Sequence, residues 1–490
     1  MNILANKRLF FAGILLFGLL AMTARTATDP DLWWHLRTGQ WIVETGHVPH
    51  SDPFSFTRGG SPWVSHEWLS EVVLFELWKH AGPRGLIAFS SIITTAGFLL
   101  LYLRCPGKPH WAAAATVLGA WASAPTWGAR PQMFTFTLAS LLLFLIERGE
   151  NRPRLLLFIP PLFLLWINLH AGFALGPALL FLYAAGLAFE SIAGTTPWQQ
   201  TRPIVVRILM TTLACLALVP LNPSGAQLYR YPLDTLRSTG MRALIVEWFS
   251  PDLHRSLYLP FMLVFLLLFV ALPSSRFSLK GRTLLPLLFT AFAALDAVRH
   301  IPIFILLAIP VIAAALTGLP DPSTLSRRHP EPRFRPLFNA AALALLAVLA
   351  LLRWETLVRQ QPAREAQLFP QKAVDYLHAN LQPDRLFVYY DWGGYAIWKL
   401  NPQYRVFADG RADLYGDNIL RQSIETVVDL HKGWQNVLDH WDVQTILVPP
   451  TSAVARALFL DPRWTGLYQD NQAVIFVRTK SSHAPQSLGI

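Results

Sequence analysis

The sequence contains few of the charged residues on which soluble proteins depend. Only 14% of its 490 residues are charged, whereas 53% are hydrophobic and the mean hydropathy is +0.35. Ordinary soluble domains carry about 25% charged residues, so this composition excludes an ordinary soluble enzyme. The formal net charge is +11, but much of the basic excess lies in short loops between apolar segments, where membrane topology accounts for it. We therefore expect no nucleic-acid partner.

Cysteine and the common cofactor motifs are also scarce. The two cysteines, Cys105 and Cys215, lie in different apolar stretches, and no CxxC or Cys/His set in the sequence predicts a zinc site. The sequence contains no P-loop and no GxGxxG, so nucleotide binding is not predicted. It also has no internal repeat, which counts against a transporter because many transporter folds are built from repeated halves.

Long apolar segments dominate the first two thirds of the chain. A helix needs about 20 apolar residues to cross a bilayer, and roughly 17 suffice. Eleven segments of this kind lie at 9–25, 85–103, 111–127, 131–147, 154–169, 172–192, 204–220, 257–273, 282–297, 300–317 and 335–352. The sequence therefore predicts a polytopic α-helical membrane protein with about 11 transmembrane helices, spanning residues 1–353 and including a long first external loop at 26–84.

The last part of the chain, residues 354–490, has the mixed composition of a soluble domain. Strand-like runs occur at 385–390, 404–408, 443–449 and 472–478, and helical patterns occur at 370–381, 393–400 and 418–440. Such alternation predicts a small α/β domain.

Charge in the loops predicts the orientation of the chain. Lys7 and Arg8 place the N-terminus in the cytoplasm, and alternation then leaves five basic loops on that side, as the positive-inside rule requires. The 26–84 loop, the 222–256 loop and the 354–490 domain fall on the opposite side. We therefore expect a protein of the plasma (inner) membrane with a cytoplasmic N-terminus and an extracytoplasmic C-terminal domain.

Polar residues within the apolar region gather at its outer edge. An ionisable group at the centre of a membrane helix costs roughly 2.5–3.5 kcal/mol on insertion scales. Its presence therefore indicates a functional or structural role. The polar residues at the outer edge are Arg130, Asn168, His170, Asp296, Arg299 and His300, together with the segment 222–256, which contains Glu247. Their common level predicts one outward-facing site. A structural alternative is that Asp296 pairs with Arg299 one helical turn away.

The first external loop opens with a helix that carries acid and base groups. Asp29 and Pro30 are a typical helix start, and Asp31 and His35 are spaced to share one helix face. A carboxylate beside an imidazole at the edge of a low-dielectric medium suits general-base catalysis. The alternative is structural: Asp31 stabilises the helix dipole and pairs with His35 or Arg37.

The rest of this loop contains further acids. Asp52 lies in a turn bounded by prolines, and a second helix is predicted from Ser65 with Glu67 and Glu71 one turn apart. We interpret the two glutamates as a capped, solvated helix start. The stretch HEWLS is not the zinc motif HExxH, because Ser70 occupies the position of the second histidine.

Two sequence motifs resemble a known family. DPDLWWHLRTGQWIVETG and the following HSDPFSF, directly after the first apolar segment, resemble the first external loop of GT-C glycosyltransferases, and most closely that of the oligosaccharyltransferase catalytic subunit. The stretch YYDWGGY at 389–395 is similar to the WWDYG motif with which that subunit recognises its acceptor, with tyrosines in place of both tryptophans and one extra glycine.

This resemblance implies a function. We expect a membrane glycosyltransferase that moves a sugar, with inversion, from a polyprenyl-phosphate-linked donor to a glycan, lipid or protein acceptor on the extracytoplasmic face. Asp31 takes the place of the catalytic acid of the first loop and acts as the base, with His35 orienting it. Asp52 takes the place of the second acid and supports the site by its charge or, together with Asp31, through a divalent metal such as Mg²⁺ or Mn²⁺.

Substrate contacts complete the expected site. Arg299 and His300 would hold the donor phosphate, because a guanidinium matches phosphate geometry. The expected acceptor-binding residues are Tyr390, Asp391, Trp392 and Glu247, and the remaining expected pocket residues are Asp29, Arg37, Asn168, His170 and Glu67. Membrane lipids are the other expected partners. The alternatives are a lipid or polysaccharide transporter or flippase, and a non-catalytic accessory protein of envelope glycan assembly.

Overall fold

The computed structural model describes residues 6–273, 280–318, 335–380 and 385–479. Contacts within the described chain divide it into two compact units. The helical unit consists of Met1–Ala27, Ser65–Arg237 and Ile245–Gln361, and the mixed unit of Thr28–Val64, Ser238–Leu244 and Pro362–Ile490, each for its described residues. The predicted division at residues 353 and 354 stays a prediction.

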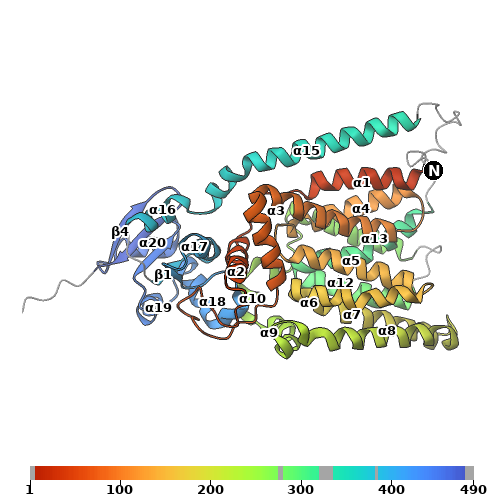
Figure 1. The fold of residues 1–490 in the computed structure, drawn as a ribbon, viewed down its shortest axis with the longest axis horizontal. Coiled ribbons are helices and arrows are strands. Elements are labelled where there is room, and N and C mark those ends of the chain that lie inside the picture. Colours follow the sequence, from red (N-terminus) through yellow and green to blue (C-terminus); the bar gives the residue numbers. More distant parts are fainter. Residues whose placement is uncertain (1–5, 274–279, 319–334, 381–384, 480–490) are drawn as a thin grey trace, which may run out of the picture. The chain divides into compact units, whose positions relative to one another are not determined.

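The helical unit is a bundle of mostly apolar helices (Figure 1). Its α-helices are α1 (Lys7–Thr23), α3 (Trp68–Arg104), α4 (Pro109–Ser123), α5 (Gln132–Gly149), α6 (Ile159–Leu169), α7 (Leu175–Ile192), α8 (Trp198–Leu218), α9 (Tyr231–Arg237), α11 (Leu259–Ala271), α12 (Gly281–Asp296) and α13 (Ile301–Leu316). The long helix α15 (Arg335–Leu368) begins in this unit and ends in the mixed unit.

Several of these helices carry local signals that fix their ends and packing. The side chain of Asn6 caps α1 by accepting from the backbone N–H of Arg8 (3.0 Å). Helices α7 and α12 pack so closely that a Cβ on Gly186 would lie 2.4 Å from the backbone of Arg282. A glycine is therefore required at this crossing.

The observed helices coincide with the predicted apolar segments. Each of the eleven segments falls on an apolar helix, with segment 85–103 forming the second half of α3 after a kink at Gly82 (φ 56°). Five described helical stretches are long and apolar enough to cross a membrane: Trp68–Arg104, Ala171–Ile192, Trp198–Leu221, Val298–Leu316 and Pro336–Leu368. The chain is an integral membrane protein, and the count of about 11 spans stays a prediction.

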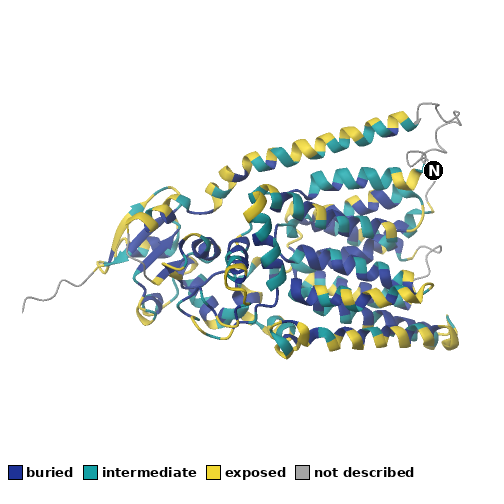
Figure 2. Ribbon diagram, viewed as in Figure 1, coloured by how far each residue is buried: buried dark blue, intermediate teal, exposed yellow. Residues whose placement is uncertain are grey.

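The outer helices present apolar side chains away from the protein interior. Only 6% of the apolar window in α15 and 28% of that in α8 are buried within the protein (Figure 2). Exposed side chains on α8 include Met210 and Leu213, at 65% and 66% exposure. Such surfaces suit contact with lipid tails.

The mixed unit contains the single described sheet, five-stranded and with the order β2-β1-β3-β5-β4. Its strands are β1 (Arg385–Val388), β2 (Arg405–Val406), β3 (Thr445–Val448), β4 (Trp464–Gln469) and β5 (Val474–Arg478). β1 pairs in parallel with β2 and β3, whereas β5 pairs antiparallel with β3 and β4. Its α-helices are α2 (Leu32–Thr45), α10 (Thr239–Leu244), α16 (Gln371–Asn380), α17 (Gly393–Leu400), α18 (Ala412–Val428), α19 (Trp434–His440) and α20 (Ala453–Leu458).

The four predicted strands are present, and the sequence analysis did not predict strand β4 or helices α10 and α20. Strand β4 is mostly exposed and α20 is only one and a half turns long, so neither produces a strong hydrophobic pattern. The helix predicted over 418–440 is two helices, α18 and α19. Leu430 (φ 51°) and Gly433 (φ 93°) adopt left-handed conformations that end the first and start the second.

Residues 28–64, within the loop predicted at 26–84, belong to the mixed unit. Phe56 N–H donates to the Val406 carbonyl (3.1 Å), and Val406 N–H donates to the Phe54 carbonyl (3.2 Å). The Thr57 hydroxyl also donates to the carbonyl of Phe407 (2.6 Å). Because β2 is an edge strand, these bonds satisfy backbone groups that the sheet leaves open. The loop thus completes one side of the sheet.

Candidate functional site

The structure sorts the predicted site residues into two groups, one in each unit. The helical unit brings together Glu67, Asn168, His170, Glu247, Arg299 and His300. The mixed unit contains Asp29, Asp31, His35, Arg37, Asp52, Tyr390, Asp391 and Trp392.

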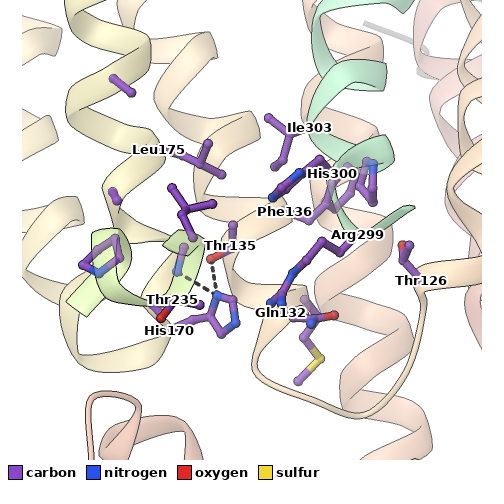
Figure 3. A pocket seen from close by; sticks show the side chains of 18 of the residues that line it. Thr126, Gln132, Thr135, Phe136, His170, Leu175, Thr235, Arg299, His300 and Ile303 are labelled. Carbon is purple, nitrogen blue, oxygen red and sulfur yellow. Dashed lines mark hydrogen bonds between the residues drawn. The ribbon is translucent and has the colours of Figure 1, made fainter. Parts of the chain in front are cut away.

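A pocket of about 330 Å³ lies within the helical unit. Its wall is mostly apolar, with Phe136 on α5 and Leu175 on α7 among the lining residues. The polar lining residues include His170, Arg299 and His300, which Figure 3 shows around the same space. A mostly apolar pocket with a basic side chain on its wall suits an amphipathic ligand.

Arg299 is fixed from two sides by a short turn. Its guanidinium lies 4.4 Å from the centre of the Trp248 ring and 3.3 Å from Glu247 Oε1. The backbone N–H of Val298 donates to the Phe249 carbonyl (3.0 Å), which ties this turn to the turn that carries Glu247. Arg299 therefore reaches the pocket in a defined conformation, with some of its five N–H donors uncommitted to Glu247.

Glu247 holds a second arginine as well. Its Oε2 lies 2.7 Å from Arg130 Nη2, and Gln132 Nε2 donates to the same oxygen at 3.3 Å. Burial raises the pKa of Glu247, but the charges of Arg130 and Arg299 outweigh it and lower the pKa to about 2. The carboxylate is thus ionised at physiological pH, and the cluster of one acid and two arginines keeps a net positive charge.

His300 and His170 differ in which nitrogen carries the proton. His300 Nδ1 lies 3.1 Å from the Ala293 carbonyl, so Nδ1 is the donor and neutral His300 offers an acceptor at Nε2. His170 Nδ1 instead accepts from the backbone N–H of Gly172 (3.0 Å), so its proton is on Nε2. In their neutral forms, His170 can donate to an anion and His300 cannot.

The two glutamates at the start of α3 are buried, at 7% exposure for Glu67 and 0% for Glu71. Their interpretation as a solvated helix start is therefore wrong. Glu67 Oε2 lies 3.5 Å from His66 Nε2 and 4.0 Å from His170 Nε2, and Ser65 donates to Glu71 (3.3 Å). These polar partners offset the cost of burying the two acids. The spacing of the acids along the sequence does not reveal that burial.

Asn168 forms hydrogen bonds within the helical unit. Its side chain accepts from Trp68 Nε1 (2.7 Å) and donates to the Leu164 carbonyl (2.9 Å). Asn222 donates to the same Asn168 oxygen at 3.2 Å. These contacts fasten α6 to α3 and to the turn after α8, and Asn168 is not among the residues that line the pocket.

Asp31 lies at the start of α2 in the mixed unit. The helix begins at Leu32, so Asp31 occupies the cap position predicted for Asp29, and Asp29 Oδ1 accepts from the Asp31 N–H (3.0 Å). The Asp31 carboxylate accepts from Trp34 Nε1 (3.3 Å). A Cβ on Gly410 would lie 1.8 Å from Asp31 Oδ1. The segment beginning at Asp409 therefore lies directly against the carboxylate.

His35 and Arg37 have different surroundings within the mixed unit. His35 is buried at 3% exposure, and its backbone N–H donates to the Asp31 carbonyl (3.2 Å). Arg37 donates to Asn401 Oδ1 (3.1 Å from Nη2) and to Gln40 (2.8 Å). Its hydrogen bonds thus hold α2 to the end of α17.

Asp52 belongs to a buried ionic network. Arg411 Nη1 lies 2.8 Å from Asp52 Oδ1, and Arg411 Nη2 lies 2.7 Å from Asp409 Oδ2. Burial raises the pKa of Asp52, but Arg411 and the bonds from Ser55 and the Phe54 N–H lower it below its ordinary value. Arg411 also lies over the Trp63 ring at 4.7 Å. Both Asp52 oxygens already accept bonds from the protein, Oδ1 from Arg411 and Oδ2 from the Ser55 N–H, so we assign Asp52 a structural role.

The acceptor-like motif lies between β1 and α17. Trp392 is buried and donates to the Leu368 carbonyl (2.9 Å), whereas Asp391 is exposed and accepts from the Tyr389 hydroxyl (3.1 Å). The Tyr390 hydroxyl has no hydrogen-bond partner among the described residues. Burial and the charges of Asp31 and Asp409 raise the pKa of Tyr390 well above its ordinary value. The motif therefore lies in the same acidic environment as the first loop.

Sequence reasoning missed two parts of these groups. In the segment DGRADLYGD (409–417), the sequence favours a plain turn over a loop site for Asp409 and Asp413, yet Asp409 and Arg411 are buried. Its signal is the density of charge directly after a strand. Arg130 is visible as an outer-edge arginine, but nothing in its neighbourhood along the chain predicts its pairing with Glu247.

Solved structures with a similar fold support the sequence resemblance. The oligosaccharyltransferase AglB of Archaeoglobus fulgidus, in complex with an inhibitory peptide and a dolichol-phosphate, has a TM-score of 0.55 at 11% identity, over 97% of this chain and 75% of that one. The apo form from the same organism also gives 0.55 at 11% identity, over 96% and 75%. The chain therefore shares the overall fold of this archaeal oligosaccharyltransferase.

A third structure is less similar in shape but closer in length. ArnT of Cupriavidus metallidurans, bound to undecaprenyl phosphate, has a TM-score of 0.48 at 16% identity, over 97% of this chain and 98% of that one. No protein-family profile and no curated protein sequence matches the chain. The two AglB structures confirm, at the level of the fold, the resemblance to an oligosaccharyltransferase that the first loop indicated.

Proposed function

We propose that this chain is a membrane glycosyltransferase that moves a sugar from a polyprenyl-phosphate-linked donor to an acceptor on the extracytoplasmic face. The observation that carries the proposal is Arg299 on the wall of an apolar pocket within the helical unit. An isoprenoid phosphate needs an apolar surface and a cation, and this pocket offers both. The AglB structure with dolichol-phosphate, which shares the fold, supports the same ligand class.

The donor phosphate binds Arg299. Its guanidinium offers paired N–H donors, which fit two phosphate oxygens. Arg130 adds positive charge nearby through its bond to Glu247. The Nε2–H of His170 lies on the same pocket wall and is a further donor. Neutral His300 carries its proton on the side of Ala293, so its contribution is to pack against Trp248.

Asp31 acts as the general base. It removes the proton from an acceptor hydroxyl or amide, and the acceptor atom attacks the anomeric carbon of the sugar. The bond from that carbon to the phosphate oxygen breaks, the electron pair stays on the departing polyprenyl phosphate, and the configuration inverts. The turn of α2 and the contact with Gly410 hold the carboxylate in place. Asp52 supports the loop through Arg411.

The acceptor binds the mixed unit through the 389–395 motif. Asp391 is the exposed acid of this motif, and Tyr390 carries the buried hydroxyl beside the acidic segment. Trp392 is held from behind by the Leu368 carbonyl and shapes the motif. Glu247, which is committed to two arginines, acts on the donor side.

Release of polyprenyl phosphate from a defined lipid-linked sugar tests the proposal. The purified protein should release it only in the presence of acceptor. Asp31→Asn should lower turnover by about 10²–10⁴-fold, the usual contribution of a general base, and Arg299→Ala should raise the KM for the donor. Arg255→Ala is the matched control, because Arg255 is an exposed arginine in the loop that precedes α11. Unchanged release by Asp31→Asn and Arg299→Ala would refute the assignment.

A further inference from the structure

The loop between α8 and α11 passes from one unit to the other and back. Its first part, α9, lines the pocket of the helical unit with residues such as Leu233 and Leu236, and Trp248 lines it after the chain returns. Between these two parts, Ser238–Leu244 belongs to the mixed unit. We call these seven residues the strap. Both neighbours of the strap along the chain are therefore walls of the proposed donor pocket.

One carboxylate holds the strap. Asp417 accepts from the Ser238 hydroxyl (2.6 Å), from the Thr239 backbone N–H (3.0 Å) and from the Thr239 hydroxyl (2.6 Å). The Ser238 hydroxyl in turn accepts from the Met241 N–H (3.1 Å), which caps α10. The approach is close, since a Cβ on Gly240 would lie 3.0 Å from Asp417 Cα.

The position of Asp417 is itself fixed by the buried network. Gly416 (φ 67°) interrupts α18 immediately before Asp417. Tyr415 donates to Asp409 and its carbonyl accepts from Arg58 Nη2 (2.8 Å). The segment 409–417 thus places Gly410 against Asp31 at one end and Asp417 on the strap at the other. One stretch of chain therefore contacts both the proposed base and the strap.

We propose that Asp417 is a positioning residue for donor binding, which rests on the function proposed above. By holding the strap, it restricts the conformations of α9 and of the Glu247–Trp248 turn. Without it, the pocket walls adopt the binding-competent arrangement for a smaller fraction of the time. The apparent donor affinity falls by that same fraction, whereas the chemical step, which depends on Asp31, is preserved.

Two variants remove the same contact in independent ways. Asp417→Ala removes all three acceptor bonds, and Gly240→Val drives a side chain into the Asp417 backbone. Asp429→Asn, at an exposed acid at the end of the same helix, is the control. Both strap variants should raise the KM for the lipid-linked donor about tenfold, as expected for a competent fraction reduced to about a tenth. Their kcat and the KM for the acceptor should stay within about twofold of wild type, and trypsin should cleave faster at Arg242.

A binding measurement separates this proposal from the proposed function. If the wild-type protein transfers no sugar, the function fails, but the strap is still tested by the affinity for polyprenyl phosphate, read from the fluorescence change of the protein's tryptophans. That dissociation constant should rise about tenfold in both strap variants and stay unchanged in Asp429→Asn. The proposal is overturned if donor affinity is unaffected in both variants, or if kcat and thermal stability fall together while the KM stays constant.

Discussion

Replacing Arg411 by glutamine tests the buried network that joins the first loop to the mixed unit. The Arg411 side chain is 1% exposed, and those of Asp52 and Asp409 are 0% exposed. The change removes the only positive charge of this network and leaves two buried carboxylates facing each other. Breaking a buried ion pair by removing one partner costs about 3–5 kcal/mol. We expect a loss of free energy of unfolding of this size.

The matched control is Arg421→Gln. Arg421 forms an ion pair with Glu425 (3.2 Å) one turn away on α18, and its side chain is 41% exposed. Exposed pairs of this spacing contribute about 0.3–0.5 kcal/mol. The two arginines therefore differ by roughly tenfold in expected cost, although they lie in neighbouring parts of the same unit.

Pulse proteolysis of the full chain in detergent, across a urea series, measures the difference. With an m-value of about 1–3 kcal/mol/M for a domain of this size, Arg411→Gln should lower the unfolding midpoint of the mixed unit by at least about 1 M. Arg421→Gln should leave it within error. Equal midpoints for the two variants would refute the argument that Arg411 stabilises the unit.

Three further predictions concern single side chains. Glu247→Gln keeps the shape of the side chain that holds Arg299 but removes a negative charge beside it, so polyprenyl phosphate should bind about tenfold more tightly, corresponding to about 1.4 kcal/mol; unchanged or weaker binding would contradict this. The pKa of Asp52 is lowered in the folded state, so its stabilisation is complete above about pH 5 and is lost as pH falls through the unfolded value of about 3.9 towards the folded one. Measured by proteolysis, the free energy of unfolding of the mixed unit should fall over this range in wild type and fall less in Arg411→Gln; an equal fall in both would contradict the pairing. Gly410→Ala should displace the Asp31 carboxylate. In the release assay, kcat should fall while the KM for the donor changes little.

The apolar helices could be predicted from the sequence because the bilayer sets their length and composition. Segment 282–297 corresponds to α12 at Gly281–Asp296, and segment 335–352 to the first half of α15. The role of Arg299 in binding the donor phosphate stays a prediction, although the structure places this residue on the wall of a pocket. What the sequence left open is its partner, since Glu247 pairs with both Arg299 and the distant Arg130.

The ionic network could not be predicted for the same reason. Arg411 and Asp52 are separated by 359 residues, and each alone resembles an ordinary turn residue. Local spacing likewise suggested that Glu67 and Glu71 face solvent, whereas residues from other helices, such as His170, surround them. Sequence patterns of a few residues predict which residues share a helix face and where turns occur. They do not report which distant segment covers a face.

The integration of the first loop into the sheet of the mixed unit has a consequence for biosynthesis. Residues 28–64 leave the ribosome hundreds of residues before β1 and β2. Until β2 is synthesised, the backbone groups of Phe54 and Phe56 lack their hydrogen-bond partner Val406. The loop therefore stays unpaired while nearly the whole helical unit is inserted. A truncated chain that starts after α15 would be synthesised without the loop and would expose that edge. Maturation of the soluble part is thereby tied to completion of the membrane part.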